Sequence, residues 1–311
     1  MNGYQEEQGL LVRTGADSLL PHIRLIIFDI DGVLVDAREA YAQAILTATR
    51  YHVSMLQRNH GLAINDERIR DLLTPAIIAS FKAVGGFNDE WDIAYVLSLW
   101  CTWLTLTSEH PLTPQEGLTQ IHGLGGGVEP AERLFQSRNP ELWPQLTKLT
   151  SRPVITRLTQ EIYAGDEATP ALFGGPPRYV HGRGTHWQER NLLSPSELDG
   201  YHGFLGIYTG RNRAEAALAL NRTGLARYFP DRMQVTASDG VLKPDPQGLQ
   251  RLCADVPSQP ALFIGDTIDD LEAVRRFRER HQEPPLLFAA VTRSSAMEPY
   301  SRAIFQHVFR T

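Results

Sequence analysis

Residues 25–36 read LIIFDIDGVLVD, and this segment organises the rest of the chain. Its four leading apolar residues predict a short, fully buried strand of the kind found in parallel sheets. Asp29 and Asp31 follow at the carboxyl end of that strand, which is the edge at which open α/β sheets bind ligands. Because residues two apart on a strand share a side, both carboxylates are expected to face one site. Gly32 allows a sharp turn or a close backbone approach there.

Two carboxylates placed at the end of one buried strand repel each other. At ~4 Å and an effective dielectric of ~20, two like charges cost about 4 kcal/mol. The repulsion is relieved when one acid is protonated or when a cation lies between them. Alternatively, Asp29 and Asp31 only begin a turn and cap the helix that follows.

The composition is that of a globular protein with one large domain or two modest ones. The chain has 311 residues, of which 42% are hydrophobic and 21% are charged. Its formal net charge of −6 argues against a nucleic-acid binder, although a local positive cluster would still suit a small anionic substrate. Cys101 and Cys253 are far apart and not in a metal-binding spacing, which favours a reducing compartment.

No stretch of the sequence predicts export or membrane insertion. Residues 1–21 are polar and lack the apolar core of a signal peptide. The longest uncharged apolar run, residues 93–107, is too short for a membrane span and contains several hydroxyl groups. We therefore expect a cytoplasmic protein that binds neither membranes nor nucleic acids.

The first two thirds of the chain predict mainly helices. Residues 1–22 predict a loosely packed N-terminal arm, and apolar residues at helical spacing dominate residues 37–199. The glycine-rich stretches 123–127 and 173–184 predict loops. The candidate helices are residues 38–51, 66–73, 75–84, 91–105, 129–136, 141–149 and 154–163.

From residue 200 onward, strand and helix patterns alternate, which predicts an α/β fold with a doubly wound parallel sheet. Because the strand at 25–28 has no partner before residue 204, residues 23–36 and 200–311 are expected to form this domain, with residues 37–199 as an all-helical insertion. The expected strands are residues 204–209, 233–236, 261–264 and 286–291. The expected helices between them are residues 213–223, 246–253 and 271–280.

Polar residues follow the later strands at corresponding places. Thr209, Gly210 and Arg211 end one strand, and a hydroxyl and backbone N–H groups at such a junction can hold a phosphate. Lys243, a rare lysine in an arginine-rich chain, lies between a leucine and a proline. Its compact ammonium would offset an aspartate and a phosphoryl group together. The alternative is a surface lysine in a proline-rich turn.

Acids recur after the strand at 261–264. Asp266 occupies the position that Asp29 holds after the first strand, and Asp270 begins a helix from which it can face the same cavity. Asp269 is expected to cap that helix or to point to solvent. If the strands are neighbours, these strand ends converge, and their hard oxygen ligands suit Mg²⁺. Such a site is suited to phosphoryl transfer.

Four segments carry these residues in order: Asp-x-Asp at 29–31, Thr-Gly at 209–210, Lys-Pro at 243–244 and Gly-Asp-x-x-x-Asp at 265–270. Together they resemble the motifs of the haloacid dehalogenase (HAD) superfamily of phosphohydrolases, over residues 24–36 and 204–292. The resemblance is to subfamily I enzymes with a helical cap, and to phosphoglycolate-phosphatase-like proteins among them. It implies a Rossmann-like catalytic core and a cap, residues 37–199, that is longer than usual and closes over the site. It also implies Mg²⁺ as cofactor and a small-molecule phosphate monoester as substrate.

The resemblance also implies a role for each motif residue. Asp29 would be the nucleophile that forms an aspartyl-phosphate intermediate. Asp31 would be the general acid and base, and its main-chain carbonyl would bind the metal. The residues implied to hold the phosphoryl group are Gly32, Thr209, Gly210, Arg211 and the charge-neutralising Lys243. The implied metal ligands are Asp29, Asp31, Asp266 and Asp270.

Within the expected cap, residues 81–89 look like a segment of a little-characterised subfamily of these phosphatases. Lys82 and Asn88 lie beside a Gly-Gly turn there and are candidates for hydrogen bonding to the substrate. A plain turn between two helices would explain the segment equally well.

Other activities use the same core. A dehalogenase needs no metal, so Asp31 together with Asp266 argues against it. A phosphonatase needs a Schiff-base lysine from the cap, for which Lys82 and Lys148 are the candidates. A phosphomutase shares the core chemistry and differs in how its cap excludes water. A non-catalytic phospho-ligand-binding protein would keep the fold, although the intact acids and Lys243 make this the weaker interpretation.

Overall fold

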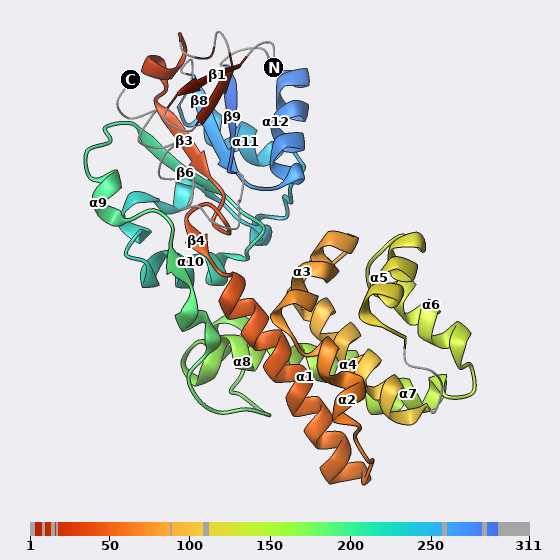
Figure 1. The fold of residues 1–311 in the computed structure, drawn as a ribbon. Coiled ribbons are helices and arrows are strands. Elements are labelled where there is room, and N and C mark those ends of the chain that lie inside the picture. The colour runs from red at the N-terminus through yellow and green to blue at the C-terminus, as the bar shows by residue number, and fades with distance from the viewer. Residues whose placement is uncertain are drawn as a thin grey trace. The chain divides into compact units, whose positions relative to one another are not determined.

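The computed structural model divides the chain into two compact units (Figure 1). Met1–Ala37 and Glu189–Thr311 form one, here called the sheet unit, and Arg38–Gln188 forms the other, the helical unit. The residues that the structure describes are 4–7, 10–13, 16, 18–87, 89–107, 112–256, 260–281 and 285–291.

The sheet unit is built on five parallel strands in the order β7-β6-β3-β8-β9. Strand β3 is central, and the chain adds β6 and β7 on one side of it before crossing to add β8 and β9 on the other. This reversal next to β3 is the switch point at which doubly wound sheets bind ligands. The predicted α/β class with a Rossmann-like parallel sheet is confirmed. The strands are β3 (Leu25–Phe28), β6 (Phe204–Tyr208), β7 (Gln234–Val235), β8 (Ala261–Gly265) and β9 (Leu286–Ala290).

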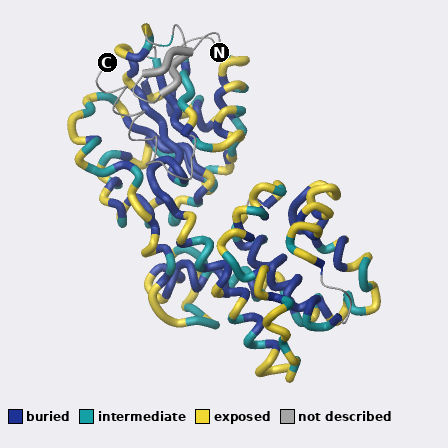
Figure 2. Tube along the Cα trace, viewed as in Figure 1, coloured by how far each residue is buried: buried dark blue, intermediate teal, exposed yellow. Residues whose placement is uncertain are grey.

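Each face of the sheet is covered by helices, so its strands are apolar on both sides. Ile26 and Phe28 of β3 pack into a core with α10 (Arg213–Arg222). Their neighbours Leu25 and Ile27 point to the opposite core, which contains residues of α11 (Gln247–Ala254) and α12 (Ile268–Arg280). Figure 2 shows the buried strands between partly exposed helices. Burial on both faces explains why four consecutive apolar residues form β3.

The chain turns tightly after β3. Gly32 has φ of 74°, a left-handed conformation that favours glycine, and its N–H donates to the carbonyl of Val35 at 2.8 Å. Strand β4 (Val35–Asp36) then pairs antiparallel with β5 (Arg190–Asn191). The chain therefore leaves the sheet unit and returns to it through two paired strands.

Residues 189–199, which the sequence analysis placed in the helical insertion, belong to the sheet unit. Leu193 and Leu198 are buried in the same core as β3, and α9 (Pro195–Leu198) is part of this segment. The sequence analysis missed this because it looked for the return of strand alternation, which begins only with β6.

The helical unit packs around α4 (Glu90–Leu106), in which thirteen of 17 residues are buried. A helix that is apolar on nearly all sides needs neighbours on all sides. Among the described residues, no helix is both long and apolar enough to cross a membrane. The other helices of the unit are α1 (Arg38–His60), α2 (Asp66–Ile69), α3 (Pro75–Val84), α5 (Pro114–Gly123), α6 (Val128–Arg138), α7 (Trp143–Leu149) and α8 (Arg152–Phe173).

Some elements differ from those expected. Helix α5 was not predicted, although Thr113 and Glu116 form a capping box at its start. The N-terminal arm contains two short antiparallel strands, β1 (Tyr4–Glu7) and β2 (Leu10–Arg13). Such short strands carry little periodic hydrophobic signal, so their pairing was not visible in the sequence.

One ion pair fixes the loop that follows α8. The guanidinium of Arg157 donates to the carbonyls of Phe173 at 2.8 Å and of Pro176 at 3.0 Å. Glu161 binds the Arg157 Nε at 2.7 Å and accepts the backbone N–H groups of Arg178, Tyr179 and Val180 at 2.8, 2.7 and 3.3 Å. Burial raises the pKa of this carboxyl, but the hydrogen bonds from Tyr179 and Arg157 outweigh burial and lower it.

We expect Glu161→Gln to lower the free energy of unfolding by about 1–3 kcal/mol at pH 7, because three backbone N–H groups and Arg157 lose a buried, charged acceptor. A lowered pKa stabilises the fold above the unfolded-state value of about 4.3, so the difference from wild type should shrink as pH falls below it. Urea unfolding followed by tryptophan fluorescence measures this, since all five tryptophans lie in the helical unit.

Glu141→Gln, which changes an exposed glutamate of the same unit, is the matched control and should be nearly neutral. An equal loss in both variants, or a Glu161→Gln effect that persists at low pH, would contradict a stabilising role for the Arg157–Glu161 ion pair.

Candidate active site

Three carboxylates meet at the carboxyl ends of two neighbouring strands. Phe28 of β3 pairs with Ile264 of β8, so the residues that follow them are adjacent. Asp29, Asp266 and Asp270 each offer an oxygen, and these oxygens lie within 4.8 Å of one another. The strand order therefore brings together acids that are more than 230 residues apart in the sequence.

Lys243 bridges two of these acids. Its Nζ lies 2.9 Å from Asp29 Oδ2 and 2.7 Å from Asp270 Oδ1, and its side chain is only 9% exposed. Burial by itself lowers the pKa of Lys243, but the charges of Asp29 and Asp270 outweigh burial and raise it above its ordinary value. The lysine is therefore a fixed cation beside Asp29. The alternative of a surface lysine is wrong.

Asp29 is buried, and its environment disfavours the charged form. Burial raises its pKa to about 7, and the nearby charges of Asp270 and Asp31 raise it as well, whereas Lys243 lowers it. The backbone N–H of Ile30 donates to Asp29 Oδ1 at 2.7 Å and fixes the orientation of the carboxyl group. This acid is held in place, and its charge depends on a nearby cation.

Asp270 has two functions in the structure. Its Oδ2 accepts the backbone N–H of Thr267 at 3.0 Å, and its own N–H donates to Thr267 Oγ1 at 3.2 Å, which forms the capping box at the start of α12. The same Oδ2 also accepts the backbone N–H of Asp266 at 3.1 Å and the Thr267 hydroxyl at 2.7 Å. The other oxygen binds Lys243. The close approach requires Gly265, because a Cβ there would lie 2.5 Å from the Asp270 Cβ.

Asp269 was expected to cap α12 or to point to solvent. It is exposed, and the capping residues are Thr267 and Asp270 instead. The alternative that Asp29 and Asp31 only begin a turn and cap the following helix does not explain the cluster that Asp29 forms with Asp266 and Asp270.

The donor set of the cluster fits a hard divalent cation. Oxygens of three carboxylates lie within 4.8 Å of one another, and Lys243 binds two of these acids. All candidate ligand atoms are oxygens, with no sulfur or imidazole, as Mg²⁺ and similar ions prefer. Burial, together with the charges of Asp270 and Asp31, raises the pKa of Asp29 to about 7, although Lys243 lowers it. A bound cation would favour the ionised form.

Asp31 lies next to this cluster but binds a different cation. Arg211 Nε donates to Asp31 Oδ2 at 2.9 Å, and Arg211 Nη2 donates to Asp31 Oδ1 at 2.7 Å. Nη2 also donates to Glu189 Oε1 at 3.0 Å. The sequence analysis assigned Arg211 to the phosphate and did not identify Glu189, which carries no motif and follows the helical unit directly.

The other residues expected to hold a phosphate end the same strands. Thr209 is buried, and its Oγ1 accepts the backbone N–H of Arg211 at 3.3 Å. Gly210 is exposed, and apart from its chain neighbours no described atom lies within 4 Å of where its Cβ would be. Gly32 uses its own N–H in the turn after β3. Their phosphate-binding roles stay predictions.

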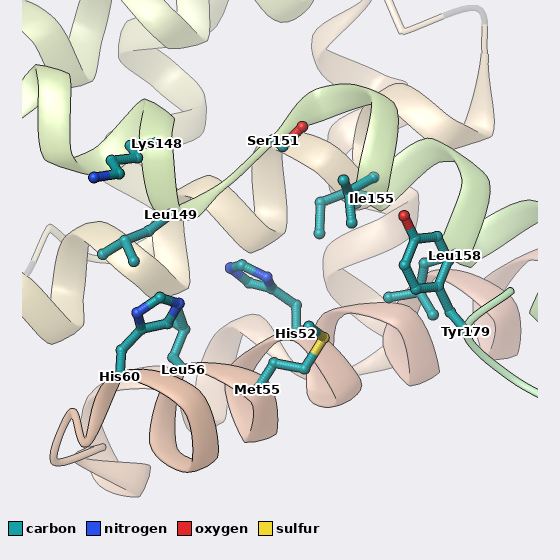
Figure 3. A pocket seen from close by; sticks show the side chains of 11 residues that line it. His52, Met55, Leu56, His60, Lys148, Leu149, Ser151, Ile155, Leu158 and Tyr179 are labelled. Atoms are coloured by element: carbon teal, nitrogen blue, oxygen red, sulfur yellow. The ribbon is translucent and has the colours of Figure 1, made fainter.

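The cap residues named from the sequence lie in the helical unit. Lys82 pairs with Glu90 at 2.5 Å and is 51% exposed, whereas Asn88 lies outside the described residues. Lys148 lines a cavity of about 160 Å³ between α1 and the segment joining α7 to α8 (Figure 3). The buried His52 in that cavity binds the Thr102 hydroxyl at 2.9 Å. Burial, and then the charge of His60, lower the pKa of His52 to about 4, so it is neutral.

The chain and its fold are similar to those of known proteins. The chain belongs to the haloacid dehalogenase-like hydrolase family, whose model matches residues 23–278. Phosphatase Tt82 from Thermococcus thioreducens is a similar solved structure, with a TM-score of 0.62 and 23% identity over 91% of this chain and 99% of that chain. This likeness establishes the fold, and the family match confirms the resemblance predicted from the motifs.

Two further solved structures are similar at lower scores. One is a HAD-superfamily hydrolase of subfamily IA from Geobacter sulfurreducens, with a TM-score of 0.42 and 18% identity over 93% of this chain and 97% of that chain. The other is a predicted phosphoglycolate phosphatase from Haemophilus somnus, with a TM-score of 0.41 and 16% identity over 90% of this chain and 91% of that chain. A search of curated proteins gives no match.

The central lysine should matter for stability as well as chemistry. We expect Lys243→Met to lower the free energy of unfolding by about 3–5 kcal/mol at neutral pH, because it leaves two buried carboxylates without their cation. The loss should be greater at pH 8 than at pH 6, because without Lys243 the pKa of Asp29 rises above about 7 and the acid is protonated at the lower pH. Denaturation followed by circular dichroism measures both effects.

Lys82→Met is the matched control, since Lys82 forms a surface ion pair worth about 0–1 kcal/mol. A Lys243→Met variant as stable as this control would show that the buried bridge is not needed.

Proposed function

We propose that the protein is a Mg²⁺-dependent phosphatase that hydrolyses small-molecule phosphate monoesters through an aspartyl-phosphate on Asp29. The observation that carries the proposal is the bridge of Lys243 between Asp29 and Asp270, beside Asp266, in a chain of the HAD-like hydrolase family. A fixed nucleophile, a cation and a metal-type acid cluster at one strand edge are what phosphoryl transfer requires.

In the first proposed step, a carboxylate oxygen of Asp29 attacks phosphorus. The bond from phosphorus to the ester oxygen breaks, its electron pair goes to that oxygen, and Asp31 provides the proton. In the second step Asp31 takes a proton from water, whose oxygen attacks phosphorus. The aspartyl oxygen–phosphorus bond then breaks, which releases inorganic phosphate and restores Asp29.

The remaining residues would bind the substrate and control charge. Lys243 and the Thr209 hydroxyl would bind the phosphoryl oxygens, together with the backbone N–H of the exposed Gly210. Asp29 and Asp266 would hold Mg²⁺, with Asp270 beside them, and the bound ion would offset charge on the phosphoryl oxygens. The helical unit is proposed as a cap over the site, and the cytoplasm as the location of the protein.

The direct test is phosphate release from a panel of metabolite monoesters and 4-nitrophenyl phosphate in the presence of Mg²⁺. We expect wild type to release inorganic phosphate, and Asp29→Asn to lose activity on the order of 10³-fold or more because the nucleophile is absent. Asp269→Asn changes the exposed acid beside the cluster and should retain activity.

Wild-type protein that leaves every ester intact would contradict the proposal and favour a phospho-ligand-binding protein. A sugar phosphate that is rearranged without phosphate release would identify a mutase instead.

Mg²⁺ binding should depend on pH through Asp29. Without metal, the raised pKa of Asp29 makes the folded state prefer the protonated acid, so its contribution to stability is lost as pH rises from about 4 to about 7. Mg²⁺ must displace that proton below pH 7 but not above it. We therefore expect Mg²⁺ to raise Tm more at pH 8 than at pH 6, measured by scanning calorimetry.

In Asp29→Asn the dependence of the Mg²⁺-induced Tm shift on pH should be much weaker. The same shift at both pH values in wild type would show that Asp29 does not take part in binding the metal.

A further inference from the structure

The carboxylate of Asp31 is held by a row of alternating charges inside the sheet unit. Arg211 binds both Asp31 oxygens, at 2.9 and 2.7 Å, and also binds Glu189 at 3.0 Å. Arg222, the last residue of α10, lies 3.7 Å from Glu189 Oε2 and donates to the Glu189 main-chain carbonyl. The row therefore extends from the turn after β3 to a helix on the face of the sheet.

Burial differs sharply along this row. The side chains of Arg211 and Glu189 are 3% and 1% exposed, whereas that of Asp31 is 41% exposed. Asp31 can therefore meet a substrate or a water molecule, whereas the guanidinium is buried and bound to two carboxylates. Moving the guanidinium to a phosphate would break its contacts with both of them. This geometry does not favour Arg211 as a phosphate ligand.

The backbone of Arg211 is also fixed. Its N–H donates to Thr209 Oγ1 at 3.3 Å, and its carbonyl accepts the N–H of Ala237 at 2.9 Å. A planar guanidinium bound along one edge to a carboxylate fixes both the position and the plane of that carboxylate, which a lysine ammonium cannot do. Glu189 holds the guanidinium in turn.

We propose that Arg211, anchored by Glu189, is a positioning residue that holds the Asp31 carboxylate for its role as base in the hydrolysis of the aspartyl-phosphate. This inference rests on the proposed function. The ion-paired carboxylate is the form that accepts a proton from water, so the effect falls on the second step. Attack by Asp29 on an ester with a good leaving group needs no proton from Asp31 and is left largely unchanged.

The test compares two kinetic constants for 4-nitrophenyl phosphate with Mg²⁺. For Arg211→Met we expect kcat to fall at least about tenfold and KM to fall with it, so that kcat/KM stays within about threefold of wild type. Stopped-flow mixing should show a burst of 4-nitrophenol followed by slow turnover, and intact-mass spectrometry should detect accumulated phosphoenzyme.

Further variants separate positioning from damage to the fold. Arg211→Lys keeps the charge without the two-oxygen contact and should give an intermediate kcat, and Glu189→Gln should act in the same direction as Arg211→Met. Arg213→Met is the matched control, because Arg213 pairs with Asp239 at 2.8 Å and should leave both constants unchanged. The Mg²⁺-induced Tm shift should be the same in every variant.

The inference is overturned if kcat and kcat/KM fall together without a burst, or if Arg211→Met turns over like wild type. A KM that rises at unchanged kcat would identify Arg211 as a phosphate ligand instead. Wild-type protein that forms no phosphoenzyme would overturn the proposed function itself, and with it this role.

Discussion

The structure of the site depends on one buried ammonium between two buried carboxylates. Without Lys243, Asp29 and Asp270 would repel each other where water cannot screen them, and burial would keep at least one of them protonated. With it, Asp29 has a cation at 2.9 Å, and α12 can begin on a carboxylate that both caps the helix and binds the lysine. Helix start and site geometry are therefore coupled through Asp270.

The strand order makes this contact possible. Because the chain passes from β3 to β6 and β7 on one side and then to β8 on the other, the central strand has both later strand ends as neighbours. Asp29 therefore lies between the Thr209 end of β6 and the Asp266 end of β8. Neither the lysine nor the acids would be a site alone. The doubly wound sheet brings them together. The long helical insertion does not separate the strands of the sheet, because the chain leaves the sheet unit through β4 and returns through its antiparallel partner β5.

Much of the fold and of the acid cluster could be predicted because the signals are local. An apolar run followed by an acid identifies a strand end, and parallel strand ends meet at one edge. The row formed by Asp31, Arg211 and Glu189 could not be predicted, since charged side chains have no periodicity that indicates a buried partner. Glu189 also lies in a segment without a strand or helix pattern. The ion pair of Arg157 and Glu161 could not be predicted either, because its other partners are backbone groups of a loop, which carry no sequence signal.

Asp29 and Asp31 are identical side chains two residues apart, and the structure distinguishes them by the cations that they meet. Asp29 is buried and meets a lysine, a point charge that offsets negative charge without constraining the plane of the carboxylate. Asp31 is partly exposed and meets an arginine along its edge, which constrains that plane. A nucleophile benefits from a nearby point charge that offsets negative charge, whereas a base needs a fixed direction toward water. Different environments around two like acids separate such roles in other hydrolases as well. The lysine beside one acid and the arginine beside the other therefore support the proposal that Asp29 attacks phosphorus and Asp31 transfers the proton.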